Sequence, residues 1–290
     1  MYHVESLFSQ RSGLCSISLY YPFRPTTNNI AMSQSAILSS IIQDHICLIT
    51  INRPEAMNAV NDKVAQGIAH HVDLTEADPY VWVVILTGAG QKAFCAGADL
   101  KMISQGRGME LAIPGKGFGG LVYAKRTKPW IAAVDGFALA GGTELALACD
   151  MIVASERAKF GLPEVTRGIL AAAGGMFRLP RVLPKAIAME YIATGKHIPV
   201  EVAQKYGMIN RLVPAGQHLE AAIALAASIV ENAPLAVQES LEIARKSYDL
   251  SDEELIQLTN EANVRIFQTK DAKEGPLAFV EKRKPRWVGE

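Results

Sequence analysis

Glu144 is a residue of this chain well placed for acid–base chemistry. Glu144 follows Gly141 and Gly142 and begins a run of strong helix formers, after an apolar stretch, Ile131–Val134, that predicts a buried strand. Glu164 follows a proline further along. A strand, a glycine turn and a helix start leave free backbone N–H groups together, which favours negative charge there. Amides that stabilise an anion beside a carboxylate indicate chemistry on a carbonyl compound, although a simple strand-to-helix turn has the same pattern.

Composition limits the classes of partner. The chain has 290 residues and is 49% hydrophobic, which suits one α/β domain with a helical appendage. Lys+Arg and Asp+Glu both number 29, and this zero net charge argues against nucleic acid or a membrane surface as the main partner. The longest apolar run, Ala221–Val230, is far shorter than the ~20 residues of a membrane span and indicates one face of a helix.

The cysteines and histidines indicate neither disulfides nor a metal site. The four cysteines are scattered without C-x-x-C spacing, which favours free thiols in a reducing compartment. Cys47 and Cys149 lie in apolar runs and are expected in the core, whereas Cys95 beside a glycine loop is a weak candidate nucleophile. His70 and His71 are neighbours in a predicted helix and point in different directions, so we expect no metal.

Residues 1–31 differ in composition from the rest of the chain. They contain two arginines, many serines and one acidic residue, a bias typical of a transit peptide, but Pro22 and Pro25 weaken the helix that such a peptide needs. Met32 begins a second plausible start, MSQSAIL. We therefore predict an N-terminal extension over residues 1–35, disordered or translated from an upstream start. The expected location is cytoplasmic, with the mitochondrial matrix as the alternative.

Strand and helix patterns alternate along most of the chain, which predicts an α/β architecture. Strands are expected at Ile46–Ile51, Val81–Thr87, Ile131–Val134, Met151–Ala154, Lys159–Leu162 and Met208–Val213. Helices are expected from Asn58 or Asn61-Asp62 to about Ala77, briefly at Leu121–Thr127, and at Pro184–Thr194 and Val200–Tyr206. From His218 onward the apolar spacing predicts three amphipathic helices, which could pack on a neighbouring subunit.

A glycine-rich segment, Gly106–Gly120, separates two of these elements. Gly115, Gly117 and Gly120 formally match the dinucleotide fingerprint G-x-G-x-x-G. No strand precedes the match and no helix begins inside it, so the context that the fingerprint requires is missing. We expect a mobile loop over the active site instead, and a dinucleotide-binding oxidoreductase is only a remote alternative.

Several stretches of the chain resemble enoyl-CoA hydratases of the crotonase superfamily. They are INRPEAMNAV at 51–60, KAFCAGADLK at 92–101, GFALAGGTELALACD at 136–150, FGLPE at 160–164 and FVEKRK at 279–284. The resemblance covers residues 36–290. It implies a crotonase-like spiral of ββα units over 36–217 and a C-terminal helical trimerisation region over 218–290. It also implies an acyl-CoA substrate, no metal or redox cofactor, and a homotrimer or a dimer of trimers.

The resemblance also assigns roles to matching positions. The backbone N–H groups of Ala98 and Gly141 match the oxyanion hole that binds the thioester oxygen. Glu144 and Glu164 match the acid pair, with Glu144 assigned to water activation and Glu164 to protonation of C2. We expect Glu144 to ionise more easily because it lies in the first turn of a helix, and Glu164 to have a raised pKa among apolar groups.

Further positions match the segments of the family that contact the CoA thioester. These positions are Ala56, Ala96, Ala98, Asp99, Leu100, Lys101, Gly141, Phe279 and Lys282. Two departures from the pattern concern specificity. Ala140 replaces a glycine found in many hydratases, and GILAAAGGMFRL at 168–179 replaces a segment that contains PGAGGTQRL in many of them. The second segment lies beside the acyl group in the family, so the acyl preference stays open.

The sequence and the resemblance leave three hypotheses for the function. The leading hypothesis is an enoyl-CoA hydratase that converts a trans-2-enoyl-CoA to a 3-hydroxyacyl-CoA through a thioester enolate. A Δ3-Δ2 enoyl-CoA isomerase or a carnitinyl-CoA dehydratase-like lyase on the same fold is the alternative, since carnitinyl-CoA dehydratases vary in the same segment and keep two acids. A catalytically idle acyl-CoA-binding protein is the alternative of another class, and the presence of both glutamates disfavours it.

Overall fold

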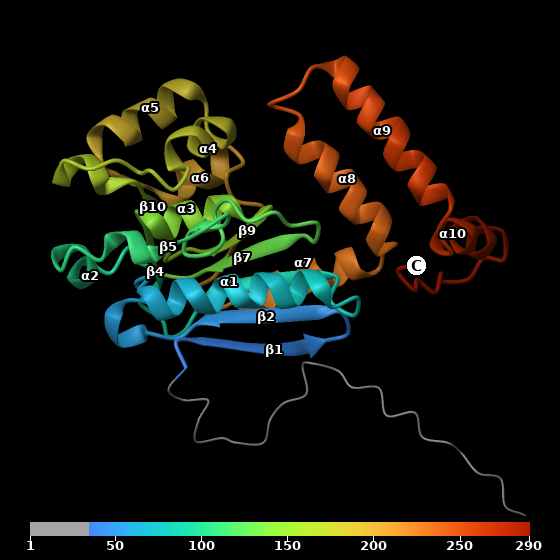
Figure 1. The fold of residues 1–290 in the computed structure, drawn as a ribbon, viewed down its shortest axis with the longest axis horizontal. Coiled ribbons are helices and arrows are strands. Elements are labelled where there is room, and N and C mark those ends of the chain that lie inside the picture. Colours follow the sequence, from blue (N-terminus) through green and yellow to red (C-terminus); the bar gives the residue numbers. More distant parts are fainter. Residues whose placement is uncertain (1–34) are drawn as a thin grey trace, which may run out of the picture.

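A six-stranded sheet forms the centre of the protein (Figure 1). The computed structural model describes residues 35–290, so the predicted extension lies outside the described residues except for its last position. The first two strands pair antiparallel and the remaining neighbours pair parallel. In spatial order the strands are β1 (Ile37–Gln43), β2 (Ile46–Ile51), β3 (Val83–Gly88), β7 (Trp130–Val134), β9 (Met151–Ser155) and β12 (Arg211–Val213).

A smaller four-stranded sheet lies beside the first, in the order β11-β10-β8-β4. Its strands are β4 (Ala93–Cys95), β8 (Phe137–Leu139), β10 (Lys159–Gly161) and β11 (His197–Ile198). A two-stranded hairpin joins β5 (Ala112–Ile113) to β6 (Gly117–Phe118). Buried residues of the smaller sheet, such as Phe94 and Phe160, belong to the same apolar cluster as residues of the six-stranded sheet, so the two sheets share one core.

Ten α-helices lie within residues 35–290. They are α1 (Asp62–Ala77), α2 (Leu100–Ser104), α3 (Gly141–Ala148), α4 (Gly175–Val182), α5 (Lys185–Thr194), α6 (Val200–Lys205), α7 (His218–Val230), α8 (Pro234–Lys246), α9 (Asp252–Phe267) and α10 (Asp271–Val280). Three short 3-10 helices are η2 (Pro54–Ala56), η3 (Gly108–Leu111) and η4 (Pro163–Arg167). The helix α1 begins where predicted, because Asn61 Oδ1 accepts the N–H of Val64 at 3.0 Å.

Helices cover both faces of the six-stranded sheet. In β3, Val84 and Leu86 join the cluster that includes α1, whereas Val83 and Ile85 join the cluster that includes α7. Successive side chains of a strand point to opposite faces, so a strand covered on both sides needs apolar residues at every position. This requirement explains the continuous apolar runs that the sequence shows at these strands.

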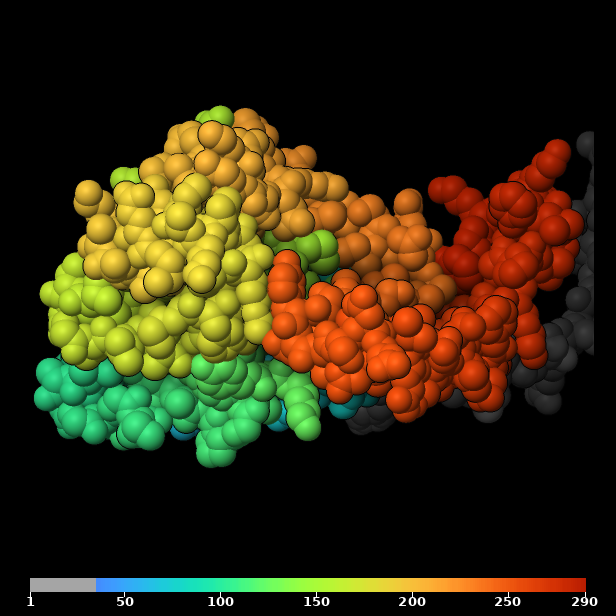
Figure 2. Space-filling model, turned by 90° about the horizontal axis from the view of Figure 1, so that it is seen from above, coloured from blue at the N-terminus to red at the C-terminus, as the bar shows by residue number. Residues whose placement is uncertain are grey.

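The last three helices extend away from this core (Figures 1 and 2). Arg245 of α8 fastens them to it: its Nε and Nη2 donate to the Asp150 carboxylate at 2.7 and 2.9 Å, and Nη1 donates to the carbonyl of Arg126 at 2.9 Å. Within residues 35–290, no single helix is long and apolar enough to cross a membrane; α7 and α8 pass that test only as a pair bent by 108°. The predicted boundary at residue 218 stays a prediction.

The strand predictions at residues 46–51, 131–134 and 151–154 are confirmed to within one residue. Two other predictions are wrong. Leu121–Thr127 forms turns instead of a helix, because the Tyr123 N–H donates to Lys116 O and the Val122 carbonyl accepts from Arg178. Gly106–Gly120, predicted to be a mobile loop, contains the 3-10 helix η3 and the β5–β6 hairpin, and no α-helix begins inside it.

Candidate active site

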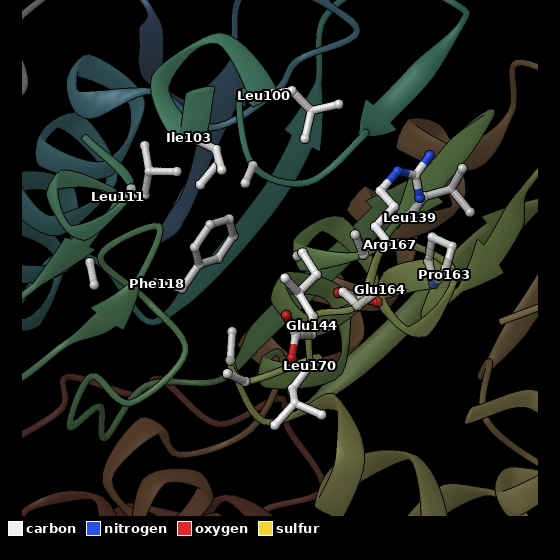
Figure 3. Close-up of a pocket in the computed structure, with 18 of the residues that line it drawn as sticks. Leu100, Ile103, Leu111, Phe118, Leu139, Glu144, Pro163, Glu164, Arg167 and Leu170 are labelled. Atoms are coloured by element: carbon white, nitrogen blue, oxygen red, sulfur yellow. The ribbon is translucent and has the colours of Figure 1, made fainter. Parts of the chain in front are cut away.

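An apolar pocket of about 400 Å³ opens between α2, the β5–β6 hairpin, the start of α3 and η4 (Figure 3). It brings together Ala98, Gly141, Glu144 and Glu164, which are far apart in the sequence. Its other lining residues are Ala96, Leu100, Ile103, Gly108, Leu111, Ala112, Gly117, Phe118, Tyr123, Leu139, Ala140, Pro163, Arg167, Ile169, Leu170, Ala172 and Ala173. The four residues that the sequence selected for chemistry therefore share one cavity.

Backbone pairing leaves two amide groups free at this pocket. Val60 bridges Ala98 in parallel: the Val60 N–H donates to Gly97 O and the Asp99 N–H donates to Val60 O. This pattern uses the Gly97 carbonyl and the Asp99 N–H, on either side of Ala98, and leaves the Ala98 N–H free. Gly141 is the first residue of α3, where a helical N–H has no partner in the preceding turn. Among the described residues, neither N–H donates to a backbone acceptor.

Glycines allow the two amide-bearing segments to approach each other. A Cβ at Gly142 would lie 1.9 Å from the Cys95 carbonyl oxygen, and a Cβ at Gly97 would lie 3.1 Å from the Gly141 nitrogen. Any side chain at either position would therefore separate β4 and its following loop from the start of α3. This contact is the reason that Ala98 and Gly141, 43 positions apart in the numbering, can face the same ligand atom.

Ala140 occupies a backbone conformation that suits glycine. Its φ of 53° and ψ of −127° match the first central position of a type II′ turn. A residue with a Cβ in such a region costs on the order of 1–3 kcal/mol, which the surrounding structure must offset. The replacement of a family glycine by alanine thus leaves the turn intact at the expense of stored strain.

Glu144 is buried in α3, with only 3% of its surface exposed, and its carboxylate turns toward the loop before α4. Its Oε1 accepts the N–H of Gly175 at 2.9 Å. Burial is the main cause that raises the pKa of Glu144 to about 7, helped by the nearby charge of Glu164 and opposed by the Gly175 amide and by Arg178. This carboxyl can therefore exist in both protonation states near neutral pH.

Glu164 begins the short helix η4 and is 7% exposed. Burial raises its pKa, as predicted, and its Oε2 is buried without a hydrogen-bond partner among residues 35–290. The expectation that Glu144 would ionise more easily is wrong. Burial of α3 and the charge of Glu164 outweigh the helix dipole, and the larger upward shift falls on Glu144.

The other titratable groups near the pocket do not form a second reaction centre. Burial raises the pKa of the Cys95 thiol to about 12, so this thiol stays protonated and is not a nucleophile. Cys47 and Cys149 are buried core thiols, as predicted. Within the described part of the chain, no group of three or more His, Cys, Asp or Glu residues could hold a metal ion.

Residues 41–290 match the family model described as enoyl-CoA hydratase/isomerase.

The chain belongs to this enoyl-CoA hydratase/isomerase family.

Among curated relatives, carnitinyl-CoA dehydratase of Salmonella arizonae is 41% identical over 246 residues, which cover 83% of this chain and 94% of that protein. Carnitinyl-CoA dehydratase of Proteus mirabilis is 41% identical over 263 residues, or 89% of this chain and all of that protein.

Solved structures of family members show the same fold. An enoyl-CoA hydratase from Mycobacterium tuberculosis H37Rv is 46% identical with a TM-score of 0.85, and covers 89% of this chain and all of its own. A carnitinyl-CoA hydratase from Mycobacterium avium is 44% identical with a TM-score of 0.71, at the same coverage. The chain therefore has the predicted crotonase fold with C-terminal helices and is an enzyme of the crotonase family.

The residues that match the family's CoA-binding segment occupy different positions in this structure. Ala96 and Leu100 line the pocket. Asp99 does not present a free carboxylate, because it forms an ion pair with Arg53 at 3.0 Å and accepts the N–H of Lys101, capping α2. Lys101 is exposed on α2, where its ammonium can meet an anionic group of a ligand.

Three further matched residues do not line this pocket. Ala56 ends the 3-10 helix η2, outside the lining. Phe279 in α10 is 85% exposed, and Lys282 follows α10 with a φ of 54°. Figure 1 shows α10 at the opposite end of the molecule from α2. Within one chain, Phe279 and Lys282 therefore do not share a site with Ala98 and Glu144.

Sequence reasoning missed several residues that shape the site. Phe118 lies across the pocket from the two glutamates (Figure 3), and a Cβ at Gly141 would lie 2.3 Å from its ring. Gly175 donates to Glu144, and Arg167 and Leu170 line the cavity. The sequence did indicate the segments that carry some of these residues, since 106–120 and 168–179 were expected near the active site. No pattern within these segments selected the particular side chains.

Proposed function

We propose that this enzyme is a lyase that removes water from, and adds water to, the C2–C3 bond of a CoA thioester, with a carnitinyl-CoA-type substrate as the leading candidate. The observation behind the proposal is that two buried carboxyls and two free amide N–H groups meet in one pocket. The relatives named carnitinyl-CoA dehydratases support a dehydratase over the plain enoyl-CoA hydratase that the sequence alone favoured.

The proposed dehydration uses the residues as follows. The Glu164 carboxylate takes the proton from C2, and the electron pair moves onto the thioester oxygen, where the amides of Ala98 and Gly141 stabilise the enolate. As the pair returns, the C3–O bond breaks, and protonated Glu144 gives its proton to the departing hydroxyl. The products are a 2-enoyl-CoA and water. Hydration is the reverse, so Glu144 activates water and Glu164 protonates C2; no metal or redox cofactor enters the balance.

The pocket wall has features that suit a carnitinyl group, which carries a quaternary ammonium. Phe118 and Tyr123 both line the cavity, and aromatic faces attract such a cation, a contact worth about 0.5–2 kcal/mol. Glu164, which is ionised at the start of the dehydration, adds negative charge across the pocket from Phe118 (Figure 3). These contacts support a cationic acyl end.

A different feature favours a second candidate, hydration of an uncharged 2-enoyl-CoA. Most of the lining is aliphatic, and the cationic Arg167 belongs to it. Arg167 would repel an ammonium group, whereas an apolar acyl chain would bury surface against Leu111 and Leu170. The solved structures of proteins named enoyl-CoA hydratase, which are 46% identical to this chain, support this candidate.

A substrate panel distinguishes the candidates. Purified enzyme is given crotonobetainyl-CoA and crotonyl-CoA in turn, loss of the enoyl thioester is followed by its ultraviolet absorbance, and the product is identified by mass spectrometry. The leading candidate predicts a higher kcat/KM for crotonobetainyl-CoA, and the second predicts the reverse. A product whose double bond has moved without gain of water would instead identify an isomerase. If no acyl-CoA were turned over, the protein would be an acyl-CoA-binding protein without catalytic activity.

We also propose a homo-oligomer, a homotrimer or a dimer of trimers, assembled through α8–α10. The helices α8–α10 expose apolar side chains, since at least 70% of the surface of Phe267, Phe279 and Val280 is exposed. Such apolar surface favours contact with another subunit. In that assembly, Phe279 and Lys282 would reach the CoA of a neighbouring site. Light scattering of the purified protein gives the assembly mass, and a monomer would contradict the proposal.

A further inference from the structure

Arg178 of α4 is the charged residue most closely connected to the segment that holds Glu144. Its Nη1 donates to the carbonyl of Ala173 at 3.1 Å, and its Nη2 donates to the carbonyl of Val122 at 2.5 Å. Its guanidinium also lies over the ring of Tyr123, 5.6 Å from the centroid. One side chain thus joins α4 to the turn after the β5–β6 hairpin and to the loop before α4.

The loop from Ala172 to Gly175 is fixed at successive positions. The Tyr123 hydroxyl donates to Ala172 O at 2.9 Å, Arg178 holds Ala173 O, and the Gly175 N–H donates to Glu144 Oε1 at 2.9 Å. Gly174 lies between them with a φ of 105°, and a Cβ there would lie 2.1 Å from Arg178 Nη1. The guanidinium therefore occupies the space that a side chain at 174 would need.

We propose that Arg178 is a positioning residue for the lyase reaction: it fixes the 172–175 loop so that the Gly175 amide orients the Glu144 carboxylate. The cation of Arg178 also favours the ionised form of that carboxylate. The inference rests on the proposed function for its kinetic consequences. Arg178 does not belong to the lining of the pocket, so it acts through Glu144.

The electrostatic part of the proposal has a definite sign. Two charged groups act directly on Glu144: Glu164 raises its pKa, and Arg178 lowers it. Arg126, Arg181 and Tyr123 act on Arg178 itself. Removal of the Arg178 cation therefore moves the pKa of Glu144 further upward, above about 7.

The test compares Arg178→Gln and Arg178→Lys with the parent enzyme. In Arg178→Gln we expect kcat to fall by about 10- to 100-fold, because a displaced loop misaligns Glu144, with little change in KM. The acidic limb of the kcat–pH profile for hydration should move to higher pH. Arg178→Lys keeps a cation but cannot donate in the same fork, so kcat should fall while the limb stays close to that of the parent.

Arg181→Gln is the matched control on the same helix. Arg181 pairs with Asp249 at 2.6 Å and lies over the ring of Phe177, and among the described residues its guanidinium forms no hydrogen bond with the 172–175 loop. This variant should keep the parent's kcat and pH profile. Equal loss in Arg181→Gln and Arg178→Gln would show a general effect of α4 and would overturn the proposal.

A second measurement does not depend on turnover. The carboxyl ¹³C resonance of Glu144, assigned by its loss in Glu144→Gln, should titrate at higher pH in Arg178→Gln than in the parent. Unchanged titration would overturn the inference even if the lyase activity is established. Conversely, a shifted titration in a protein without lyase activity would support the Arg178–Glu144 connection and reject the proposed function. Should Arg178→Gln not fold, Arg178→Lys decides: a parent-like kcat would overturn the positioning role.

Discussion

The two walls of the pocket differ in how tightly the fold constrains them. The wall that the proposed function places against the thioester is formed by residues 95–98 and 139–144 and is largely buried. Its backbone segments approach so closely that a single added Cβ at Gly142 would lie 1.9 Å from the Cys95 carbonyl oxygen. The wall that the proposed function places against the acyl group includes Ile169 and Leu170, which are 52% and 65% exposed. Under the proposed function, the chemistry therefore depends on a fixed backbone, and the substrate preference depends on replaceable side chains.

The largest effect is expected from the acids on the constrained wall. Glu144→Gln and Glu164→Gln should each lower kcat by about 10²- to 10⁴-fold, because an amide neither accepts nor supplies the proton at C2 or at the oxygen. Steady-state kinetics with the preferred substrate measures the loss, and calorimetric binding of a saturated acyl-CoA should stay near the parent value. Near-full activity in either variant would reject its assigned role.

A backbone change on the same wall should have the next largest effect. A Cβ in Gly142→Ala must push the Cys95 carbonyl away, which displaces the Ala98 and Gly141 amides, and loss of one such donor costs about 10²- to 10³-fold in kcat. Gly275→Ala in α10 is the control, since the new Cβ there meets only Trp287 at 3.2 Å. If Gly142→Ala were as active as Gly275→Ala, the close packing would not matter for catalysis.

The constrained wall should also give the protein a distinctive pH dependence of stability. The folded Glu144 carboxyl, with a pKa of about 7, keeps its proton where the unfolded carboxyl, near 4.5, has lost it. The unfolded state then binds fewer protons, so the free energy of unfolding falls as pH rises through this range, by about 3 kcal/mol. Urea unfolding at pH 4.5 and pH 8 measures the fall, and Glu144→Gln should lack this share of it.

Changes on the exposed wall should be smaller and selective. Leu170→Ala should lower kcat/KM by about 10-fold for the acyl group that contacts it, with little loss for shorter ones, because only part of an exposed leucine leaves water on binding. Met189→Ala in α5, 54% exposed and outside the pocket lining, serves as the control. A uniform loss over all acyl lengths would mean that this wall also supports the chemistry.

The smallest effect is expected from a change on the constrained wall that removes a side chain instead of adding one. Ala140→Gly removes a Cβ from a strained φ of 53° while adding freedom to the unfolded chain. The two effects leave a gain of about 1 kcal/mol in the free energy of unfolding, with kcat unchanged. Chemical unfolding of both proteins gives the difference, and a destabilised Ala140→Gly would show that the turn is not strained.

The same contrast explains what the sequence could predict. The buried strands at 46–51 and 131–134 were found because a strand covered on both faces must be apolar throughout. The amide pair and the two acids were found because their roles require small residues and carboxylates in recognisable motifs. The strand Ile37–Gln43 was missed, since it lies at the sheet edge and is only partly buried.

What the sequence missed depends on contacts between distant segments. No local pattern reveals that Arg178 reaches the carbonyl of Val122 or that Gly175 donates to Glu144. The prediction that Glu144 ionises more easily than Glu164 was wrong for the same reason. The helix dipole at Glu144 can be inferred from the sequence, but the burial of its carboxyl cannot. The helix α4 contains Pro180, which argues against a helix unless its neighbours are known.

The contact between Gly142 and the Cys95 carbonyl also bears on how such an enzyme can change over generations. At 1.9 Å there is no side chain, however small, that position 142 can try without moving its neighbour. The residue at position 142 therefore cannot vary, whereas the residues that face the acyl group can. A lineage built on this frame would diversify by exchanging its acyl-facing loops while inheriting one reaction, and a protein engineer seeking a new substrate would begin at Leu170 and leave Gly142 untouched.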